Sequence, residues 1–536
     1  MGRGWVACLA GWGHGHHSHD GAPTHRTCGS GAGTGGTTAR GGAGALGLTC
    51  VLAALWGGRA AESPNIVFIM ADDLGFGEVG AYPAGSPNGR IATPNLDWYF
   101  AQGGMRFTNA YAGYTVCAPS RTTLMTGRHS GNFESHGLDG MHLAPGQEVT
   151  LAEVLKRAGY RTALFGKSAP LTEPVLSGFD YFLGQVDQMD CHNMYPCTLD
   201  SGRGRGSYPL PLNQKAPSRT ACMEAPGFYN YTTDVFVDRA LSWLDGVSAQ
   251  EDPFFLYLSL TVPHAGGWTD DNQETGNPVP SDLQYAGQEE WPDVEKDHAA
   301  SVTYMDAKIG EVMGRLQALG KDENTLVLFA SDNGAHLEGG HSHTFFNSTG
   351  GLRGHKRSMY EGGVRSPSMA RWPSRVKAGS VSHEPWAFWD VLPTLAEVAG
   401  ASALVPLGLD GRSFYPTLLN KSSGGEERMF YFTGEGDWAG DGTVGTGASG
   451  SRYPTRKSAA TTYAVRTGRW KAIGLECHGE PSGGDPMELY DLEADPFEKH
   501  DIADTAAGQS VLKYIKVKLI SDRLSCKCFQ CKPSPH

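Results

Sequence analysis

The stretch Pro64-Asn65-Ile66-Val67-Phe68-Ile69-Met70-Ala71-Asp72-Asp73 is apolar on both faces until it ends in two adjacent carboxylates. A strand that is apolar on both faces is typical of the centre of a parallel sheet that helices cover on both sides. Open α/β sheets place their active sites at the carboxyl ends of their strands. The stretch therefore predicts an α/β fold with Asp72 and Asp73 at its functional edge.

Strand and helix patterns alternate on the C-terminal side of this stretch. Apolar runs predict strands over 161–166, 253–262 and 325–330, and apolar residues at helical spacing predict helices over 150–158, 233–244, 299–319 and 387–399. Short stretches over 462–473 and 488–492 predict antiparallel strands. The alternation indicates a doubly wound, mostly parallel sheet flanked by helices. We predict a catalytic α/β domain over 62–410 and a smaller antiparallel domain with a cysteine-rich tail over 411–536.

Residues 1–61 differ in composition from the rest and are interpreted as a low-complexity leader, although their histidine tract at 14–19 could also bind a metal. The apolar stretch 43–56, which Arg40 precedes and Ala60-Ala61 follows, has the parts of a secretory signal in their usual order. It is shorter than the ~20 residues that a membrane span needs. We expect cleavage near Ala61, no stable membrane span, and an extracellular or lysosome-like location. A later translation start, a membrane anchor and an organelle leader are the alternatives.

The overall charge is acidic, with a formal net charge of −13 at pH 7. A nucleic-acid-binding protein would favour a basic face, so we expect no nucleic-acid partner. An acidic chain can still bind an anionic substrate, because a cationic pocket can be local. With 40% hydrophobic residues, the composition is that of a globular protein.

The pentapeptide Cys117-Ala118-Pro119-Ser120-Arg121 is an uncommon setting for a structural thiol. It resembles the signature of the sulfatase family, in which this cysteine is oxidised to Cα-formylglycine in the secretory pathway. Further segments resemble that family in the same order, namely ADDLGFGEVG (71–80), TPNLD (93–97), FGK (165–167), VPHAGG (262–267), FASDNGAHLEGGH (329–341), LRGHKRSMYEGGVRSP (352–367), FWDVLPTLAEVAG (388–400) and ELYDLEADPFE (488–498). The resemblance is strongest to arylsulfatases of the bacterial and arylsulfatase A type.

The resemblance implies an alkaline-phosphatase-like fold and hydrolysis of sulfate monoesters. Hydrated formylglycine is a gem-diol, in which one hydroxyl attacks sulfur and the other expels the product. Cys117 would then provide the nucleophile. Arg121 lies one helical turn further on, where it can neutralise the charge of the nucleophile if the pentapeptide opens a helix. The plain alternative for Arg121 is a surface arginine.

Four residues offer hard oxygen ligands at the ends of two predicted strands: Asp72, Asp73, Asp332 and Asn333. Together with an oxygen of the modified Cys117 and one of the sulfate, they provide the ligand number that suits Ca²⁺, with Mg²⁺ as the second choice. Without the family resemblance, the same residues would be interpreted as a helix cap and a turn.

Four more side chains are implied to act on the substrate. Lys167 and Lys356 would hold the sulfate oxygens as charge develops on them, and His264 would protonate the leaving alcohol. Taken singly, such residues are more often solvated or structural. Many sulfatases have a histidine two residues after the first of these lysines, but Ala169 stands there. His192 lies in a segment resembling bacterial relatives that also lack this histidine, and it is predicted to supply the missing base.

Seven cysteines remain between the leader and the C-terminus once Cys117 is set aside: Cys191, Cys197, Cys222, Cys477, Cys526, Cys528 and Cys531. An oxidising compartment favours disulfides, which we predict within the first three and within the C-terminal cluster, with the connectivity open. The same C-terminal cluster lacks the second half of a zinc site. Sequons at Asn230, Asn347 and Asn420 predict N-linked glycans.

Two other functions are compatible with these motifs. Related folds act on phosphoryl groups, so the alternative enzyme is a phosphomonoester or phosphonate hydrolase. A pseudosulfatase that binds sulfated glycans without cleaving them is the non-enzymatic alternative, which Ala169 favours. For a sulfatase we expect a sulfated small molecule or glycan as substrate and a formylglycine-generating enzyme as maturation partner. The sequence carries no readable code for the natural ester or the oligomeric state.

Overall fold

The computed structural model describes residues 63–82, 88–133, 136–188, 190–202, 204–215, 230–266, 276–421, 427–435, 461–475 and 487–521. The predicted leader and its signal, Cys222, Cys477 and the C-terminal cysteine cluster all lie outside these ranges. None of the helices within them combines the length and the apolar character that a membrane span requires.

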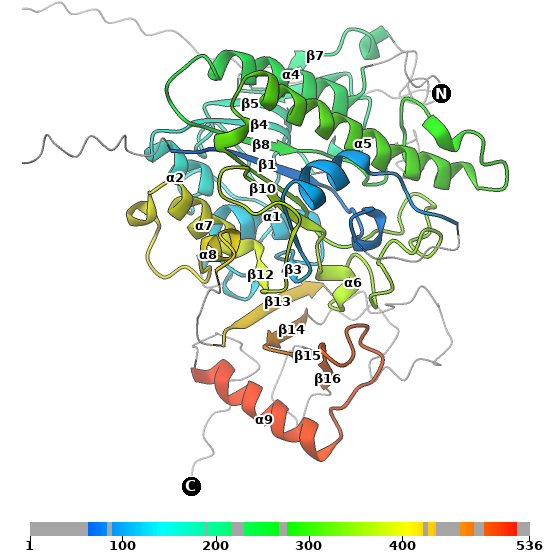
Figure 1. The fold of residues 1–536 in the computed structure, drawn as a ribbon, viewed down its shortest axis with the longest axis vertical. Helices are drawn as coiled ribbons and strands as arrows, with labels where there is room; N and C mark the ends of the chain where they lie inside the picture. The colour runs from blue at the N-terminus through cyan, green and yellow to red at the C-terminus, as the bar shows by residue number, and fades with distance from the viewer. Residues whose placement is uncertain are drawn as a thin grey trace, which may run out of the picture. The chain divides into compact units, whose positions relative to one another are not determined.

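The stretch that opens the fold forms β1 (Asn65–Ala71), which lies between β8 (Phe254–Ser259) and β9 (Thr325–Ser331). Both neighbours are parallel to β1, with Phe68 opposite Tyr257 on one side and Leu328 on the other. These strands form the centre of a ten-stranded sheet in the order β11-β2-β10-β9-β1-β8-β4-β5-β6-β7 (Figure 1). The remaining strands are β2 (Met105–Phe107), β4 (Arg161–Lys167), β5 (Tyr181–Gln185), β6 (Thr198–Ser201), β7 (Gly204–Pro209), β10 (Ser368–Arg371) and β11 (Ser380–Ser382).

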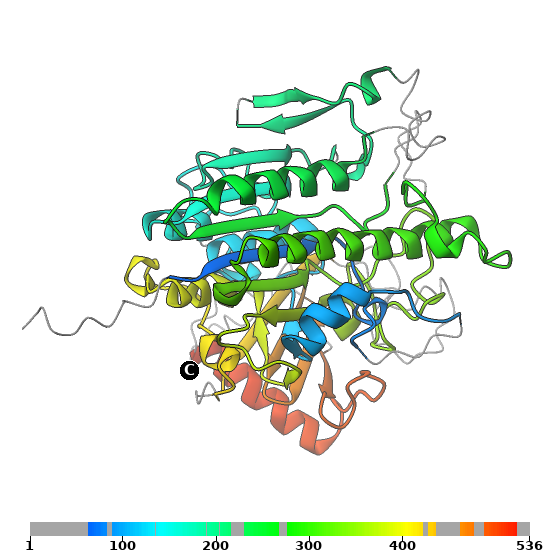
Figure 2. The same cartoon turned by 45° about the horizontal axis from the view of Figure 1, so that its top comes forward.

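Each face of β1 contributes to its own hydrophobic core. Val67 and Ile69 pack into the core that also contains α4 (Thr232–Val247) and α5 (Asp293–Ala318). Figure 2 shows these two helices side by side along the sheet. The alternate residues of β1 face the second core, with α1 (Cys117–Thr126), α2 (Leu151–Arg157) and α7 (Val391–Val398). The predicted two-sided burial of β1 is therefore confirmed.

Both edges of the sheet depart from parallel pairing. The central strands from β9 to β5 are parallel, whereas β10 pairs antiparallel with β9 and with β2, and β6 pairs antiparallel with β5 and with β7. The prediction of a mixed, mostly parallel sheet flanked by helices is confirmed.

A separate four-stranded antiparallel sheet follows, as predicted from the short alternating stretches. Its strands are β13 (Met429–Glu435), β14 (Thr461–Thr467), β15 (Trp470–Leu475) and β16 (Met487–Asp491), and α9 (Ala506–Ser521) comes after them. The stretch 462–473 forms a hairpin of two short strands, in which the chain turns at Gly468, whose φ is +52°. Only a residue that tolerates positive φ fits that turn easily.

The predicted disulfide within Cys191, Cys197 and Cys222 is not found among the described residues. Cys117, Cys191 and Cys197 are all free thiols. Cys191 is buried and its Sγ donates to the Asp187 carbonyl oxygen at 3.1 Å, whereas Cys197 is exposed. The Cys191 thiol thus has a backbone carbonyl oxygen as its partner, and not the second cysteine that we expected.

Candidate active site

The carboxyl ends of β1 and β9 bring the four predicted oxygen ligands together. The Asp73 backbone nitrogen donates to Asp332 Oδ1 at 3.0 Å, and Asn333 Nδ2 donates to Asp73 Oδ1 at 2.7 Å. Asp73 adopts a φ of +67°, an uncommon conformation for a residue with a side chain. All four residues are fully buried. The parallel pairing of β1 with β9 is what aligns these two strand ends.

Cys117 is the first residue of α1, so the pentapeptide opens a helix as predicted. Its Sγ lies within a cluster in which the ligand atoms of Asp72, Asp73, Cys117 and His264 are all within 4.8 Å of one another. Burial, and then the charge of Asp72, raise the pKa of the Cys117 thiol. The unmodified side chain is therefore a neutral thiol and a weak nucleophile.

Arg121 is not the surface arginine of the alternative interpretation, because it is fully buried. Its Nε donates to Asp332 Oδ2 at 2.8 Å, and its Nη2 lies 3.5 Å from Asp72 Oδ2. Its Nη1 donates to the Ser259 hydroxyl, which in turn donates to the Lys167 carbonyl oxygen at 2.7 Å. Arg121 thus connects α1 to the ends of β1, β8 and β9.

The two predicted sulfate-binding lysines are buried and each pairs with one of the adjacent carboxylates. Lys167 Nζ lies 2.7 Å from Asp72 Oδ2, and Lys356 Nζ lies 2.7 Å from Asp73 Oδ2. Burial would lower the pKa of each lysine, but the groups around it, with Asp72 foremost for Lys167 and Asp73 for Lys356, together outweigh burial and raise both pKa values. Both lysines therefore remain cationic.

The two predicted histidines stack on each other, with ring centroids 4.0 Å apart. His264 Nδ1 lies 2.6 Å from the Ala265 carbonyl oxygen, to which it can only donate. Its Nε2 faces Asp73 Oδ2 at 3.3 Å and Lys356 Nζ at 3.0 Å. His264 Nε2 is therefore the nitrogen that is available to exchange a proton at the centre of the site.

The donor atoms fit a hard cation. Asp72 Oδ1 and Asn333 Oδ1 are buried and have no hydrogen-bond partner within the described part of the chain. Burial would raise the pKa values of Asp72 and Asp73, but the surrounding positive groups, with Lys167 foremost for Asp72 and His264 for Asp73, together outweigh it, so both carboxyls are ionised. Asp332 differs, since both of its oxygens already accept hydrogen bonds and burial, with the Asp72 charge, raises its pKa to about 6.

Sequence reasoning did not single out Glu338 and Ser259. Glu338 Oε2 lies 2.6 Å from Lys356 Nζ, and its Oε1 lies 2.6 Å from Arg357 at the rim of the site. Ser259 is the last residue of β8 and bridges Arg121 and Lys167. Glu338 belongs to the segment FASDNGAHLEGGH, where it follows Asn333 closely, and this position was the available signal. A single glutamate in a loop does not indicate an active-site role unless its contacts are known.

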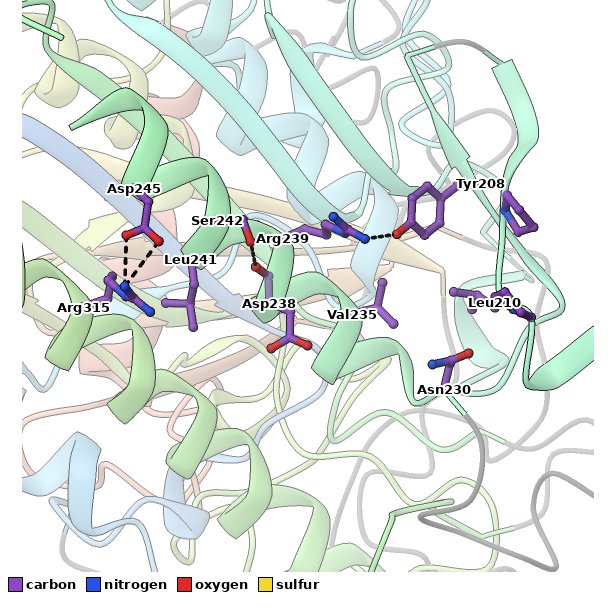
Figure 3. Close-up of a pocket in the computed structure, with 12 residues that line it drawn as sticks. Tyr208, Leu210, Asn230, Val235, Asp238, Arg239, Leu241, Ser242, Asp245 and Arg315 are labelled. Atoms are coloured by element: carbon purple, nitrogen blue, oxygen red, sulfur yellow. Dashed lines mark hydrogen bonds and ion pairs between the residues drawn. The ribbon is translucent and has the colours of Figure 1, made fainter. Parts of the chain in front are cut away.

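A pocket of about 520 Å³ lies away from this centre, beside α4 (Figure 3). It is lined by Tyr208, Pro209, Leu210, Pro211, Asn230, Val235, Asp238, Arg239, Leu241, Ser242, Asp245 and Arg315. Arg239 donates to the Tyr208 hydroxyl, and Arg315 lies 3.1 Å from Asp245, so both arginines of the pocket pair with other residues that line it. None of the predicted site residues lines this pocket.

The fold gathers ionised carboxylates and buried cations at the carboxyl edge of a mostly parallel sheet, where open α/β enzymes bind their substrates. A site that combines cation ligands with lysines suits an anionic ester. The class defined by this fold and site is therefore an α/β enzyme with the alkaline-phosphatase-like architecture.

Comparisons with known proteins place the chain within that class. The family model "Sulfatase" matches residues 64–401. Arylsulfatase A from Homo sapiens is 33% identical over 514 residues, which cover 87% of this chain and 89% of that protein. N-acetylgalactosamine-6-sulfatase from Mus musculus is 30% identical over 405 residues, covering 70% of each. The crystal structure of i-CgsB with a bound neocarrahexaose shares the fold, with a TM-score of 0.63 and 24% identity. The match covers 86% of this chain and 92% of that one. The chain belongs to the sulfatase family and is a sulfuric ester hydrolase.

Proposed function

We propose that this enzyme hydrolyses sulfate monoesters of the arylsulfatase type through a formylglycine formed from Cys117, with Ca²⁺ as the bound cation and Mg²⁺ as the second choice. The observation that carries the proposal is the position of the Cys117 Sγ, which lies within 4.8 Å of the ligand atoms of Asp72 and Asp73. A thiol facing packed core would have excluded this function.

The charges of the site support the cation. Three buried carboxylates face three buried cationic side chains: Asp72, Asp73, Asp332, Arg121, Lys167 and Lys356. These charges cancel, so the buried groups alone do not favour an anionic ester. Asp72, Asp73, Asp332 and Asn333 would hold the cation, and it would supply the positive charge that attracts a sulfate oxygen and acidifies a bound hydroxyl.

The chain's own residues divide the remaining work. Hydrated formylglycine at position 117 would provide two hydroxyls, one to attack sulfur and one to expel the product. Arg121 would hold Asp332 in place beside this position, since its guanidinium contacts both Asp332 and Asp72. Lys167 and Lys356 would bind sulfate oxygens and stabilise the charge that develops on them.

Proton transfer would fall to the stacked histidines. His264 Nε2 would donate a proton to the leaving oxygen, because Nδ1 is held by the Ala265 carbonyl oxygen. His192, whose ring lies against that of His264, would accept a proton from the second hydroxyl at position 117 and so replace the histidine missing at Ala169. Ala169 is buried, and its methyl side chain cannot exchange a proton.

The same proposal fixes the expected partners. The substrate would be a sulfated small molecule or glycan, and a formylglycine-generating enzyme would act on Cys117 during maturation. The composition of residues 43–56 supports entry into the secretory pathway, where that oxidation takes place. The acidic net charge gives no support to a nucleic-acid partner.

Mass spectrometry of the peptide that contains Cys117 tests the proposal. In enzyme from its native cell we expect the mass of formylglycine at this position, together with turnover of a generic aryl sulfate. Cys117→Ala should lower kcat by roughly 10⁴-fold or more, as removal of a nucleophile does elsewhere. An intact thiol in fully active enzyme would overturn the mechanism, and turnover of a phosphate or phosphonate ester in place of the sulfate would overturn the substrate class.

A further inference from the structure

A second group of buried side chains lies near the reaction centre and has no part in the proposed reaction. Glu78, His298 and His341 bring three ligand atoms within 4.8 Å of one another, and each residue is at most 3% exposed. Glu78 ends the 3-10 helix Phe76–Glu78, His298 belongs to α5, and His341 lies in the loop after β9. Three separate segments thus converge on one buried point.

The proton on His298 is fixed by Asn277. In the amide orientation that satisfies all of its neighbours, Asn277 donates to the Pro263 and His264 carbonyl oxygens at 3.0 and 3.1 Å, and its oxygen faces His298 Nδ1 at 3.2 Å. His298 Nδ1 must therefore carry a hydrogen. In a neutral imidazole, Nε2 then carries a lone pair. That lone pair faces an oxygen of Glu78 at 2.6 Å, which is an acceptor as well.

The proton on His341 is fixed in the same way by Glu295. His341 Nδ1 lies 2.7 Å from Glu295 Oε2, while Glu295 Oε1 accepts from the Ser342 backbone nitrogen at 2.9 Å. His341 Nε2 is left 3.9 Å from Glu78 Oε1, with no hydrogen-bond partner among the described residues. Because Nδ1 points at a carboxylate oxygen and donates its hydrogen there, a neutral His341 ring carries its lone pair on Nε2.

Glu78 completes the arrangement. Its Oε2 accepts from the Gly75 backbone nitrogen at 2.6 Å, and its Oε1 is the atom that faces both histidines. Within the described part of the chain, neither Glu78 nor Glu295 forms an ion pair with a lysine or an arginine. Three acceptor atoms therefore converge, namely Glu78 Oε1 and the Nε2 atoms of His298 and His341. The buried carboxylates of Glu78 and Glu295 have no lysine or arginine within the described residues to balance their charge.

We propose that Glu78, His298 and His341 bind a divalent transition-metal ion of the Zn²⁺ type, at a site separate from the hard-cation site of the reaction centre. Two imidazole nitrogens and one carboxylate oxygen are a ligand set that Zn²⁺ accepts, with a fourth position left for water. Asn277 and Glu295 hold the outer nitrogens of the two rings, as partners of metal-bound histidines regularly do. The ion would also balance both carboxylates.

Such a site would brace the loops of the reaction centre. Glu78 follows Asp73 by five residues, and His341 belongs to the loop that also carries Lys356. Asn277 holds the His264 carbonyl oxygen. The ion would therefore tie together segments that position the proposed cation ligands, one sulfate-binding lysine and the proposed acid. The inference does not depend on the identity of the ester that is hydrolysed.

Metal analysis of the intact enzyme tests the inference. The protein is purified without chelators, and its zinc content is measured; it is then dialysed against EDTA and titrated with Zn²⁺ or Co²⁺ alone. We expect about one equivalent of tightly bound transition metal per chain, and a visible absorption band when Co²⁺ enters a site with imidazole ligands. Absence of both would overturn the inference, because His298 would then be a doubly protonated imidazolium that donates to Glu78.

Glu78→Gln is the decisive variant, since it should fold without the ion. Its amide oxygen can accept from the Gly75 nitrogen while its amide nitrogen donates to His298 Nε2. We expect at least about 10- to 100-fold weaker Zn²⁺ binding, whereas His343→Gln, next to the cluster, should bind like wild type. Unchanged affinity in Glu78→Gln would overturn the site. Cys117→Ala should retain Zn²⁺ binding, so loss of sulfatase activity and loss of this site remain distinguishable.

Discussion

Lys356 contacts three other side chains of the candidate active site at once. Its ammonium contacts Asp73, Glu338 and His264 at 2.7, 2.6 and 3.0 Å. An ammonium has three protons to donate, so it can satisfy Asp73, Glu338 and, whenever His264 Nε2 carries no proton, that nitrogen as well. If Lys356 binds sulfate as proposed, one of these contacts would pass to a sulfate oxygen while the others hold the lysine in position.

Replacement of this lysine should therefore damage catalysis more than folding. We expect Lys356→Ala to lower kcat by about 10²- to 10³-fold, since a preorganised donor to developing charge is typically worth that much. Lys156→Ala removes a lysine whose side chain is 45% exposed and should leave kcat unchanged. Steady-state kinetics on an aryl sulfate would decide, with the melting temperature of each variant as a check on folding. Equal losses in both variants would contradict the assignment.

The role proposed for His192 separates two steps of the reaction. If His192 accepts the proton that allows the product to leave, His192→Ala should release the alcohol in a rapid burst and sulfate slowly. Rapid-quench measurement of both products distinguishes this from a general loss of activity. His142, whose side chain is 71% exposed, provides the control substitution to alanine. Wild-type turnover in His192→Ala would show that another group serves as the base.

At the level of single residues, the sequence singled out those members of the candidate site that belong to compact motifs, and the structure brings them together. Asp72, Cys117 and Asp332 each follow or open a regular element, so the fold determines where they lie. Glu338 and Ser259 escaped prediction because their importance comes only from contacts made across the fold. The disulfide prediction was wrong at Cys191, which is a free thiol. An oxidising compartment only permits disulfides, whereas the distance between two sulfur atoms in the fold decides whether they form.

At the level of elements, β4 and β8 approach each other so closely beside Lys167 that a side chain does not fit. Gly166 has a φ of +110°, and a Cβ placed on it would lie 1.9 Å from the Ser259 carbonyl oxygen. Because both partners are backbone within a paired sheet, neither can move away cheaply. The motif Phe165-Gly166-Lys167 is therefore a structural requirement for placing the lysine.

Gly166→Ala should lower stability substantially, by about 2–4 kcal/mol, because strain and overpacking add. Gly159→Ala is the matched control, since Gly159 also has a positive φ of +90° but no atom within 4 Å of the position that a Cβ would take. We expect it to cost only about 1 kcal/mol. Thermal unfolding followed by circular dichroism compares the two. If Gly159→Ala lowered stability as much as Gly166→Ala or more, backbone strain alone, and not the close approach of Ser259, would explain the requirement for glycine at 166.

Element boundaries were less predictable than element types. The strand β8 ends at Ser259, although the apolar run continues to 262, because Leu260 and Val262 are buried in the loop that leads to His264. The helix α5 begins at Asp293, well before the predicted 299, since Glu295 and His298 are buried polar residues that hide the helical pattern. The first error arises because a buried loop can be as apolar as a strand, and the second because buried polar residues interrupt the apolar pattern of a helix.

Within the compact unit that begins at Glu62, buried charges connect the small antiparallel sheet to the rest. Lys471 of β15 lies 2.8 Å from Glu361 Oε1 and 2.9 Å from Glu498 Oε1, and all three are at most 1% exposed. Arg365 also pairs with Glu361. Removing one member of such a network leaves an uncompensated buried charge, which typically costs about 3–5 kcal/mol.

This network makes stability depend on pH in a defined direction. Burial, and then repulsion by Glu361, raise the pKa of Glu498 to about 7 from its ordinary 4.5, despite the opposing effect of Lys471. The folded enzyme therefore holds a proton that the unfolded chain releases. The stabilisation is fully present below about pH 4.5 and is lost as the pH rises through about 7.

Glu498→Gln removes this titration, so its melting temperature should fall less than that of wild type between about pH 5 and pH 8. The slope is the readout, since glutamine changes the hydrogen bonds of the network at every pH. Glu493→Gln, at a side chain that is 70% exposed, should retain the wild-type slope. If Glu498→Gln kept that slope as well, the proton would reside elsewhere. The expected result would mean that the contact between β15 and the segments that carry Glu361 and Glu498 is strongest at acidic pH.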